Sequence, residues 1–418
     1  MRILILGSGG REHSLAWAIA QNPICEKLFC IPGNAGISKI AECFDVDINN
    51  QRLIVDFCIK KEIDFVVIGP EAPLASGVSD ALRNQNIKTF GPSKMASKLE
   101  SSKSFTKSFC KKANIPTADF QIFSSLELAI KYISKAEFPI VIKADGLASG
   151  KGVFIASNSY EAIEKTKEIF NGVVDGSGNK VVIEEFLHGQ EVSYFVLSDG
   201  KRFIPICSVQ DYKKAFDGDL GPNTGGMGAI CPAPHFPPEI ENKVLKNIIK
   251  PTIEKMKQQG TPYIGVLYAG LMISNGEPYL IEYNVRFGDP ECQAIMVRIG
   301  GQILDLLLHC CEGTLDNAST KWAQDHSLVI VLASKGYPDR YKIGSHIPNL
   351  KNFQSESNVE IFHAGTSIKN RKIISSGGRV LNLTVKANNL QDARERAYNL
   401  LKEWHWKEGY FRKDIGLI

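Results

Sequence analysis

Residues 139–156 read PIVIKADGLASGKGVFIA, which is a strand-like run, a glycine-rich connection and a second strand-like run. The first run carries Lys143 near its end, and three glycines with a second lysine follow at once. This is not a Walker A loop, because Lys151 is followed by Gly152 rather than by serine or threonine. The pattern predicts a flexible flap that folds its amides over nucleotide phosphates, above a lysine fixed on a strand. A plain hairpin turn is the alternative.

The residues around this flap predict a mixed α+β unit over 103–312. Further strand-like runs lie at 180–187, 191–200 and 270–284. The last run contains Asn275-Gly276, which is a strong signal for a hairpin turn. Residues 217–238 are rich in glycine and proline and have no periodicity. Because they lie between strong elements of one unit, we expect an ordered active-site loop rather than a disordered linker.

The chain before this unit predicts a parallel sheet flanked by helices. Strand-like runs at 2–6, 27–31 and 64–70 alternate with helical patterns at 12–20 and 74–85. Glycine and proline loops follow the strands at 7–10, 32–36, 69–73 and 91–93. Ligands bind at the carboxyl ends of strands in such sheets, so we expect residues 1–102 to form an α/β substrate-binding domain. Residues 313–418 hold three strand-like runs and a helical pattern at 390–404, which predict a small C-terminal α/β domain.

The first glycine cluster lies between a strand and a helix, at Gly7-Ser8-Gly9-Gly10. Its amides and the helix N-terminus favour an anion, and we expect the phosphate of a small substrate there. A nicotinamide dinucleotide would require glycine where Glu12 stands and an acidic residue where Pro32-Gly33-Asn34 follows the second strand. A tight turn without a ligand stays open.

The end of the strand at 180–187 offers a second nucleotide feature. An edge segment over Glu184, Glu185, Phe186 and Leu187 can present alternating N–H and C=O groups to an adenine ring, and Glu191 can hold ribose hydroxyls. Taken alone, this would be an ordinary exposed strand end.

Glu282 and Asn284 stand two residues apart in a predicted strand and therefore face the same side. Their oxygen atoms suit one Mg²⁺ ion. Arg286 follows two residues later and faces the same side. It places a permanent cation where a phosphoryl group would transfer. A structural salt-bridge network is the competing interpretation.

Composition excludes several other classes of protein. The formal net charge of +4 over 418 residues gives no sign of a basic nucleic-acid-binding face. No apolar run reaches the length of a membrane span, and the opening RILILG is too short for a signal peptide. The ten cysteines form no CxxC pair, so we expect reduced, mostly buried thiols and a cytoplasmic protein.

Seven motifs occur in one order along the chain: LGSGGREH, PGNAG, GPEAPL, IKADGLASGKGV, GPNTGGMGA, LYAGLMI and RFGDPE, with GGRVL and RKDIG closing it. Together with the lysine and Glu–Asn spacing, they resemble the phosphoribosylamine–glycine ligase family of the ATP-grasp superfamily, from Ile3 to Gly416. The resemblance implies a multidomain α/β and α+β fold: an N-terminal substrate domain, a two-part ATP-grasp unit whose lid covers about 118–187, and a C-terminal domain.

The resemblance also implies a reaction. ATP, glycine and 5-phosphoribosylamine would give ADP, phosphate and glycinamide ribonucleotide through glycyl phosphate, in de novo purine (IMP) biosynthesis. Mg²⁺ or Mn²⁺ would accompany ATP. The partners would be these small molecules, without nucleic acid or membrane, and the protein would be a monomer or a weak dimer.

Residue roles follow from the resemblance, position by position. Nucleotide phosphates would meet Lys103, Lys143 and the flap residues Gly146, Ser149, Gly150, Lys151 and Gly152. The adenine and ribose would meet Glu184, Glu185, Phe186, Leu187 and Glu191, and the metal would meet Glu282 and Asn284. Arg286 and Asp289 would act with Lys143 on glycine and the transferring phosphoryl group. Phosphoribosylamine and the substrate side would meet Gly9, Gly10, Arg11, Glu12, Asn34, Glu71, Asp211, Asn223, Thr224, Gly225, Gly226, Met227 and Gly228.

The chain departs from the expected pattern at two positions. Gly270 stands where some ATP-grasp enzymes have another acidic metal ligand, so water and phosphate oxygens would complete the coordination. Cys292 follows RFGDPE where threonine is expected, which affects only local packing.

Three rival functions remain to be weighed. Another ATP-grasp ligase, such as a carboxylase or a formate-using transformylase, would share the flap and the metal strand, but PGNAG, GPNTGGMG and RFGDPE favour glycine and phosphoribosylamine. The flap and Glu12 argue against a nicotinamide oxidoreductase. Intact Lys143, Glu282, Asn284 and Arg286 argue against a non-catalytic nucleotide sensor.

Overall fold

The N-terminal part of the chain is a five-stranded parallel sheet in the order β3-β2-β1-β4-β5, as its alternating pattern predicts. The structure is a computed structural model that describes residues 1–148, 152–174, 176, 179–321, 323–354 and 356–417. The strands are β1 (Arg2–Gly7), β2 (Lys27–Pro32), β3 (Glu42–Cys43), β4 (Phe65–Ile68) and β5 (Lys88–Phe90). The helices are α1 (Gly10–Ile19), η1 (Ile37–Lys39), α2 (Gln51–Lys61), α3 (Glu71–Ser76) and α4 (Val78–Arg83).

Both faces of this sheet are buried, which explains the continuous apolar run of its central strand. Ile3 and Ile5 of β1 lie in one core cluster, which includes residues of α1, and Leu4 and Leu6 lie in the other. Successive strand residues point to opposite faces, so a strand covered on both sides needs apolar residues throughout.

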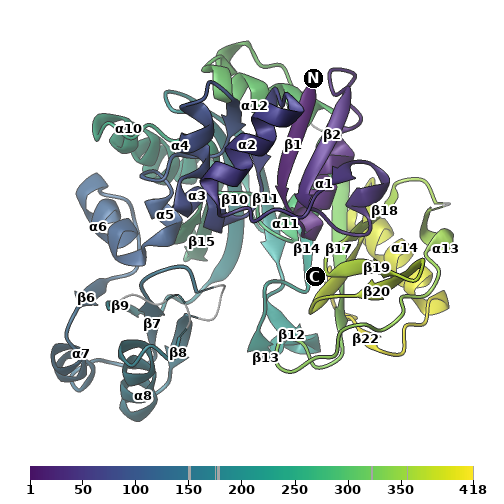
Figure 1. Cartoon of the computed structure of the whole chain (residues 1–418). Coiled ribbons are helices and arrows are strands. Elements are labelled where there is room, and N and C mark those ends of the chain that lie inside the picture. The colour runs from purple at the N-terminus through teal and green to yellow at the C-terminus, as the bar shows by residue number, and fades with distance from the viewer. Residues whose placement is uncertain (149–151, 175, 177–178, 322, 355, 418) are drawn as a thin grey trace.

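A four-stranded antiparallel sheet in the order β6-β9-β7-β8 forms the lid (Figure 1). Its strands are β6 (Phe120–Phe123), β7 (Ile140–Ala144), β8 (Val153–Ala156) and β9 (Val181–Glu185), and its helices are α7 (Leu126–Ile133) and α8 (Ser159–Phe170). Helices α5 (Lys98–Ser101) and α6 (Lys103–Ala113) connect the N-terminal sheet to the lid. The lid has its own small apolar core, in which Ile142, Val181 and Ile183 are buried.

A nine-stranded sheet forms the largest part of the molecule, in the order β16-β15-β10-β11-β14-β17-β21-β18 with β22 paired to β17. Its strands are β10 (Gln190–Asp199), β11 (Phe203–Asp211), β14 (Gly228–Cys231), β15 (Ile264–Ser274), β16 (Glu277–Asn284), β17 (His326–Ser334), β18 (Val359–His363), β21 (Arg379–Ala387) and β22 (Gly409–Tyr410). The expected hairpin turn at Asn275-Gly276 joins β15 to β16 and is confirmed.

The remaining elements flank this sheet. The helices are α9 (Pro238–Val244), the π-helix η3 (Leu245–Ile249), α10 (Lys250–Gln258), α11 (Glu291–Ile299), α12 (Gln302–Glu312), η4 (Leu315–Asn317), α13 (Lys351–Gln354) and α14 (Leu390–Glu403). Two hairpins stand apart, β12 (Lys214–Phe216) with β13 (Leu220–Asn223) and β19 (Thr366–Lys369) with β20 (Lys372–Ser375); η2 (Asp217–Asp219) lies within the first. In the part of the chain described, no helix alone is long and apolar enough to cross a membrane, although the bent pair α11 and α12 passes that test together by length and composition.

The stretch 217–238 is ordered, as expected, but it is not a simple loop. It contains β13 and β14, and β14 is an interior strand of the nine-stranded sheet. Ile230 of β14 pairs with Leu328 of β17, so the sheet runs without interruption from the central part into the C-terminal part. The multidomain α/β and α+β class is confirmed, whereas the continuity of this sheet has no signal in the sequence.

Two buried histidines join the N-terminal part to the C-terminal part. The His363 amide donates to Nδ1 of His13 at 2.7 Å, and the side-chain amide of Asn34 donates to the His363 carbonyl at 2.8 Å. Burial lowers the pKa of His13 to about 3, with His363 and Lys39 adding to the shift. Burial followed by Lys39 lowers the pKa of His363 to about 4. His13 must stay neutral, because a protonated Nδ1 could not accept this hydrogen bond.

We predict that the chain loses stability as pH falls below the ordinary histidine pKa. Both pKa values are depressed in the folded state, so the unfolded state binds more protons between about pH 6.5 and pH 4. The free energy of unfolding should fall by about 2 to 3 kcal/mol between pH 7.5 and pH 5.5 through this pair. Urea unfolding of wild type, His13→Gln and His405→Gln would test this. The pH slope should flatten in His13→Gln and persist in His405→Gln, whose histidine is exposed; equal slopes in all three would contradict the assignment.

Candidate active site

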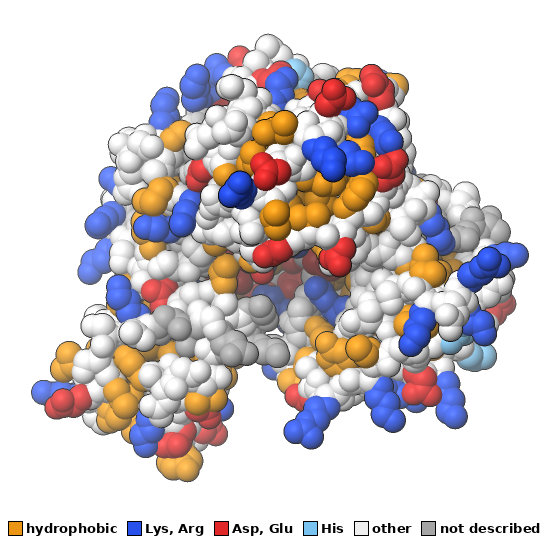
Figure 2. Space-filling model, viewed as in Figure 1, with side chains coloured by type: hydrophobic (Ala, Val, Ile, Leu, Met, Phe, Trp, Pro, Cys, Tyr) orange, Lys and Arg blue, Asp and Glu red, His pale blue; other side chains and the backbone are white. Residues whose placement is uncertain are grey.

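The N-terminal part, the lid and the C-terminal part of the chain face a common cleft (Figure 2). Charged side chains gather at its floor, and a cavity of about 300 Å³ there is lined by Glu282, Asn284, Arg286 and Asp289 together with residues of the N- and C-terminal parts. A neighbouring cavity of about 250 Å³ opens between the lid and strands β15 and β16. Many of the expected site residues therefore line these two neighbouring cavities.

Lys143 and Lys103 lie where the lid meets the floor of the cleft. Nζ of Lys143 contacts Oε2 of Glu184 at 2.9 Å and donates to the Ile281 carbonyl at 3.2 Å. Nζ of Lys103 donates to the carbonyl of Gly146, at the start of the flap, at 3.0 Å. Burial lowers the pKa of Lys103, although Glu282 opposes the shift. Both ammonium groups can meet an anion held under the flap.

The flap itself is described only at its two ends. Gly146 has φ +126°, a backbone conformation that side chains rarely adopt, and Gly152 stands directly before β8. The expected phosphate contacts of Ser149, Gly150 and Lys151 fall outside the described residues.

The 250 Å³ cavity includes the expected adenine and ribose residues, with one correction. Glu184 and Glu185 belong to β9, an interior strand of the lid, so they are not an edge segment. The Glu185 amide already donates to the Asp119 carbonyl at 3.0 Å. Phe186 and Leu187 follow the end of β9 and line the same cavity. The Glu184 carboxylate is buried against Lys107 and Lys143, while Glu191 lies at the cavity and pairs with Lys213 at 2.6 Å.

Glu282 and Asn284 face the cleft from the same side of β16, as expected. Burial opposes the charge on Glu282, but Lys213, Lys143 and Lys103 outweigh it and lower its pKa, so the carboxylate is ionised. Gly270 pairs with Glu282 across β15 and β16, and a Cβ there would lie 3.3 Å from the Glu282 Cγ.

The described residues contain no cluster of three or more His, Cys, Asp or Glu that could hold a metal. An ionised carboxylate beside an amide oxygen fits a hard divalent cation whose other ligands are water and phosphate.

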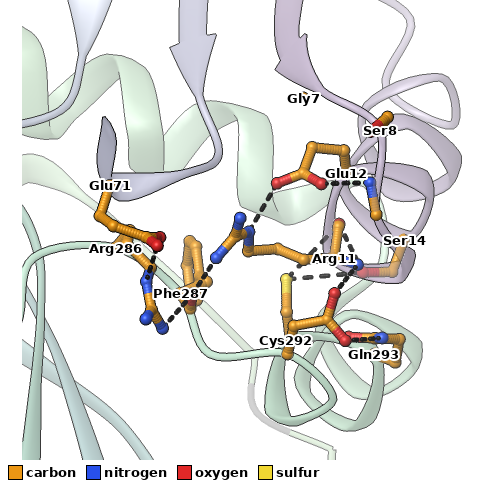
Figure 3. Close-up of polar contacts among 12 residues, drawn as sticks. Gly7, Ser8, Arg11, Glu12, Ser14, Glu71, Arg286, Phe287, Cys292 and Gln293 are labelled. Carbon is orange, nitrogen blue, oxygen red and sulfur yellow. Dashed lines mark hydrogen bonds and ion pairs between the residues drawn. The ribbon is translucent and has the colours of Figure 1, made fainter. Parts of the chain in front are cut away.

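Arg286 is held between two carboxylates that come from the N-terminal part and the connector. Its Nε contacts Glu71 at 3.2 Å, and its Nη2 contacts Glu100 at 2.9 Å (Figure 3 shows Glu71). Burial lowers the pKa of Arg286, but Glu100 and Glu71 outweigh this and raise it. Burial raises the pKa of Glu100 to about 7, although Arg286 opposes the shift. Arg286 therefore stays charged and fixed at the cleft floor.

The first glycine cluster borders a further cavity of about 370 Å³, which is lined by Ser8, Gly9 and Asn34 among others. Two amides at the start of α1 already have partners in the protein, and the phosphate expected there stays a prediction. The Gly9 amide donates to Oε2 of Glu12 at 2.6 Å, and Oε1 accepts from Nε of Arg11 at 2.6 Å (Figure 3). The Arg11 amide donates to Asp289 at 3.2 Å. Glu12 is a capping residue that places a negative charge at the N-terminus of α1. Asn34 is likewise bonded through both atoms of its side-chain amide, to Ser8, Gly36, Ile37 and His363.

The chain matches the three models of one family in sequence order. These are the phosphoribosylglycinamide synthetase N domain at residues 1–100, its ATP-grasp (A) domain at 101–292 and its C domain at 327–418. A phosphoribosylamine–glycine ligase of Brucella melitensis is 47% identical over 416 residues, which cover 100% of this chain and 97% of that protein. The chain belongs to the phosphoribosylamine–glycine ligase family. The family expected from the motifs is confirmed, and with it a ligase of purine biosynthesis built on an ATP-grasp fold.

Solved structures agree with this membership. The crystal structure of the phosphoribosylamine–glycine ligase of Thermotoga maritima has a TM-score of 0.87 and 34% identity, covering 99% of this chain and 100% of that one. A biotin carboxylase of Campylobacter jejuni has a TM-score of 0.74 at 18% identity, covering 100% of this chain and 94% of that one, which shows a common fold.

The GPNTGGMGA motif of this family member divides into a part that faces the cleft and a part that does not. Asn223, Thr224 and Gly225 line the cavities. Met227 is fully buried, and a Cβ on Gly228 would lie 2.7 Å from the Val329 carbonyl, so these two residues are packed in the interior. Gly226, with φ +113°, packs against Pro290. Only the first half of the motif therefore agrees with the expected substrate role.

Asp211 and Lys213 stand together at the cleft. Asp211 is expected on the substrate side and lines the 300 Å³ cavity. Burial raises its pKa to about 7, although Lys213 opposes the shift. Nζ of Lys213 lies 3.9 Å from Asp211 and 2.6 Å from Glu191, so this lysine joins the substrate end of the cleft to the nucleotide end.

Several cleft residues were not expected from the sequence, among them Glu100, Lys213 and Arg379. Arg379, within the GGRVL motif, donates to the Gly225 carbonyl at 2.6 Å and contacts Asp289 at 3.4 Å. The place of Arg379 within the GGRVL motif could have identified this residue from the sequence. Glu100 and Lys213 carry no such signal, because their importance comes from partners far away in the sequence.

We predict that Arg379→Gln releases the Asn223–Gly226 segment, because the substitution removes the charged donor that ties it to Asp289. Hydrogen exchange should show faster exchange at the Gly225 and Gly226 amides, while the core strands keep their protection. Arg371→Gln, at an exposed turn of the same C-terminal part, is the matched control. Unchanged exchange in Arg379→Gln would show that other contacts hold the segment.

Proposed function

We propose that this cleft joins glycine to 5-phosphoribosylamine with ATP, through glycyl phosphate, and releases glycinamide ribonucleotide, ADP and phosphate. One observation carries the proposal: Lys143, Glu282 and Arg286, which come from the lid and from the end of β16, converge with both terminal parts of the chain on one cleft. Family membership supports the same reaction.

The chemistry requires two steps. A carboxylate does not acylate an amine at neutral pH, because oxide is not a leaving group. A glycine carboxylate oxygen first attacks the γ-phosphorus of ATP, the bond to the β–γ bridging oxygen breaks, and ADP leaves. The amine of phosphoribosylamine then attacks the acyl carbon, phosphate leaves with the C–O bond electrons, and the nitrogen loses a proton. Asp211 lies at the cleft with a pKa of about 7, which suits a group that takes this proton.

The chain's own residues hold these reactants. Lys103 and Lys143 bind the nucleotide phosphates, and the flap from Gly146 to Gly152 covers them and excludes water from the acyl phosphate. The Glu185 carbonyl and the Leu187 amide bind adenine, and Glu191 binds ribose. Arg286 neutralises charge at the transferring phosphoryl group, and Asp289 positions glycine.

Glu282 and Asn284 would hold the divalent ion, Mg²⁺ or Mn²⁺, which when bound neutralises phosphate charge. Phosphoribosylamine enters between Glu71, Asp211 and the Asn223–Gly225 segment. We also propose a monomer or weak dimer that acts in the cytoplasm on small molecules, without nucleic acid or membrane, and a domain division at 1–102, 103–312 and 313–418.

We predict that ADP release requires glycine and phosphoribosylamine together, in the presence of Mg²⁺. A coupled assay should compare glycine, formate and bicarbonate side by side with the same enzyme. Only glycine should support turnover and yield glycinamide ribonucleotide. ADP release driven by formate or bicarbonate would assign the chain to a different ATP-grasp reaction.

We predict that Glu282→Ala abolishes turnover and leaves the fold intact, because it removes the only carboxylate of the proposed metal pair. Glu277→Ala on the same strand is the control, since Glu277 is exposed and pairs with Lys243. Circular dichroism and thermal unfolding should match wild type in both variants, and only Glu282→Ala should lose activity. Full activity in Glu282→Ala would refute the metal role.

A further inference from the structure

Lys107 is a buried lysine that the proposed reaction does not use. It stands on α6, and its Nζ contacts Oε2 of Glu184 at 2.9 Å. The same oxygen contacts Nζ of Lys143 at 2.9 Å. The side chains of Lys107, Lys143 and Glu184 are only 3%, 5% and 3% exposed. One carboxylate oxygen is thus shared by two buried ammonium groups.

This arrangement is electrostatically unusual. Two buried ammonium groups repel each other, and each has lost its hydration. Packing alone does not account for this cost in free energy. Burial lowers the pKa of Lys107, although Glu184 opposes the shift. With both lysines charged, the trio carries a net charge of one positive unit. Without Lys107, Lys143 and Glu184 would form a neutral closed pair.

The position of Lys107 connects it to the nucleotide end of the cleft. It follows Lys103 by one helical turn, and both lysines line the same small cavity as Lys143, Glu184 and Glu282. Nζ of Lys107 also donates to Oγ1 of Thr117 at 2.6 Å, and Thr117 donates to the Leu280 carbonyl at 2.6 Å. Lys107 is therefore anchored between α6 and β16, whereas Lys143 belongs to the lid.

We propose that Lys107 is a positioning residue for ATP: it holds Glu184 permanently, so that Lys143 can leave this carboxylate and meet the nucleotide phosphates. The inference rests on the proposed function, since it takes Lys143 to be a phosphate ligand. When Lys143 turns to a phosphate, Glu184 keeps one buried partner and is not left as an unpaired charge. The positive charge of the trio then attracts the phosphates.

The test measures the affinity for ADP with Mg²⁺ by calorimetry, and the KM values for ATP and glycine, in a set of variants. Lys107→Met should weaken ADP binding by about tenfold or more, because ADP must then compete with a closed Lys143–Glu184 pair. KM for ATP should rise while KM for glycine stays unchanged. Lys111→Met, an exposed lysine on the same helix, should leave both values unchanged.

The double variant Lys107→Met with Glu184→Gln distinguishes a positioning role of Lys107 from a purely structural role of this residue. Removing the carboxylate charge along with Lys107 frees Lys143 again, so ADP affinity should return toward wild type. If Lys107 only supported the fold, the second substitution would not restore binding. Lys107→Met alone keeps a neutral Lys143–Glu184 pair and buries no unpaired charge, so the single variant should fold. The double variant leaves Lys143 without this carboxylate, so its thermal unfolding is measured beside ADP binding. Glu184→Gln alone should bind ADP at least as tightly as wild type.

Lys143→Met distinguishes the failure of the proposed function from the failure of the positioning role of Lys107. If Lys143→Met does not weaken ADP binding, the assignment of Lys143 to the phosphates fails, and this part of the proposed function fails with it. If Lys143→Met weakens binding but Lys107→Met does not, or if the double variant binds as weakly as Lys107→Met, the positioning role of Lys107 is overturned. Weaker binding in Glu184→Gln would overturn it as well.

Discussion

The ion pairs of Arg286 with Glu71 and Glu100 hold the cleft together, because they join the segment after β16 to helix α3 of the N-terminal part and to the connector before the lid. The two carboxylates keep this partly buried guanidinium charged and fixed, and the guanidinium in turn favours the ionised form of both carboxylates. The three groups come from separate parts of the chain. The cleft floor therefore forms only when these parts are correctly assembled.

The same principle applies throughout the cleft. Glu12 is balanced by Arg11, Asp289 by Arg379, Glu191 by Lys213 and Glu184 by two lysines. Charges that are already paired and oriented need little rearrangement when a charged reactant enters. Burial raises the pKa of Glu100 and of Asp211 to about 7, although Arg286 opposes the first shift and Lys213 the second.

Local pattern was sufficient to predict much of the fold. The period of the apolar residues in the first strands, the Asn275-Gly276 turn and the same-side placement of Glu282 and Asn284 all depend on neighbours in sequence, and all agree with the structure. What the sequence pattern missed is which partner a side chain contacts in the folded protein. Glu12 caps its own helix and accepts from the Gly9 amide, which the glycine pattern did not indicate, and Met227 is buried in the core. Likewise, Glu100 and Arg286 are 186 positions apart, and no periodicity reveals such a pair.

The continuous sheet has a consequence for dividing the chain. Strand β14 pairs with β11 on one side and with β17 on the other. A fragment that ended at residue 312 would leave the β17 side of β14 as a bare edge, with unpaired amides and carbonyls beside the apolar Ile230. Such edges recruit strands from other molecules and lead to aggregation. The ATP-grasp part and the C-terminal part are therefore not interchangeable modules, and insertion or exchange of parts is better tolerated at the lid, which closes its own small core.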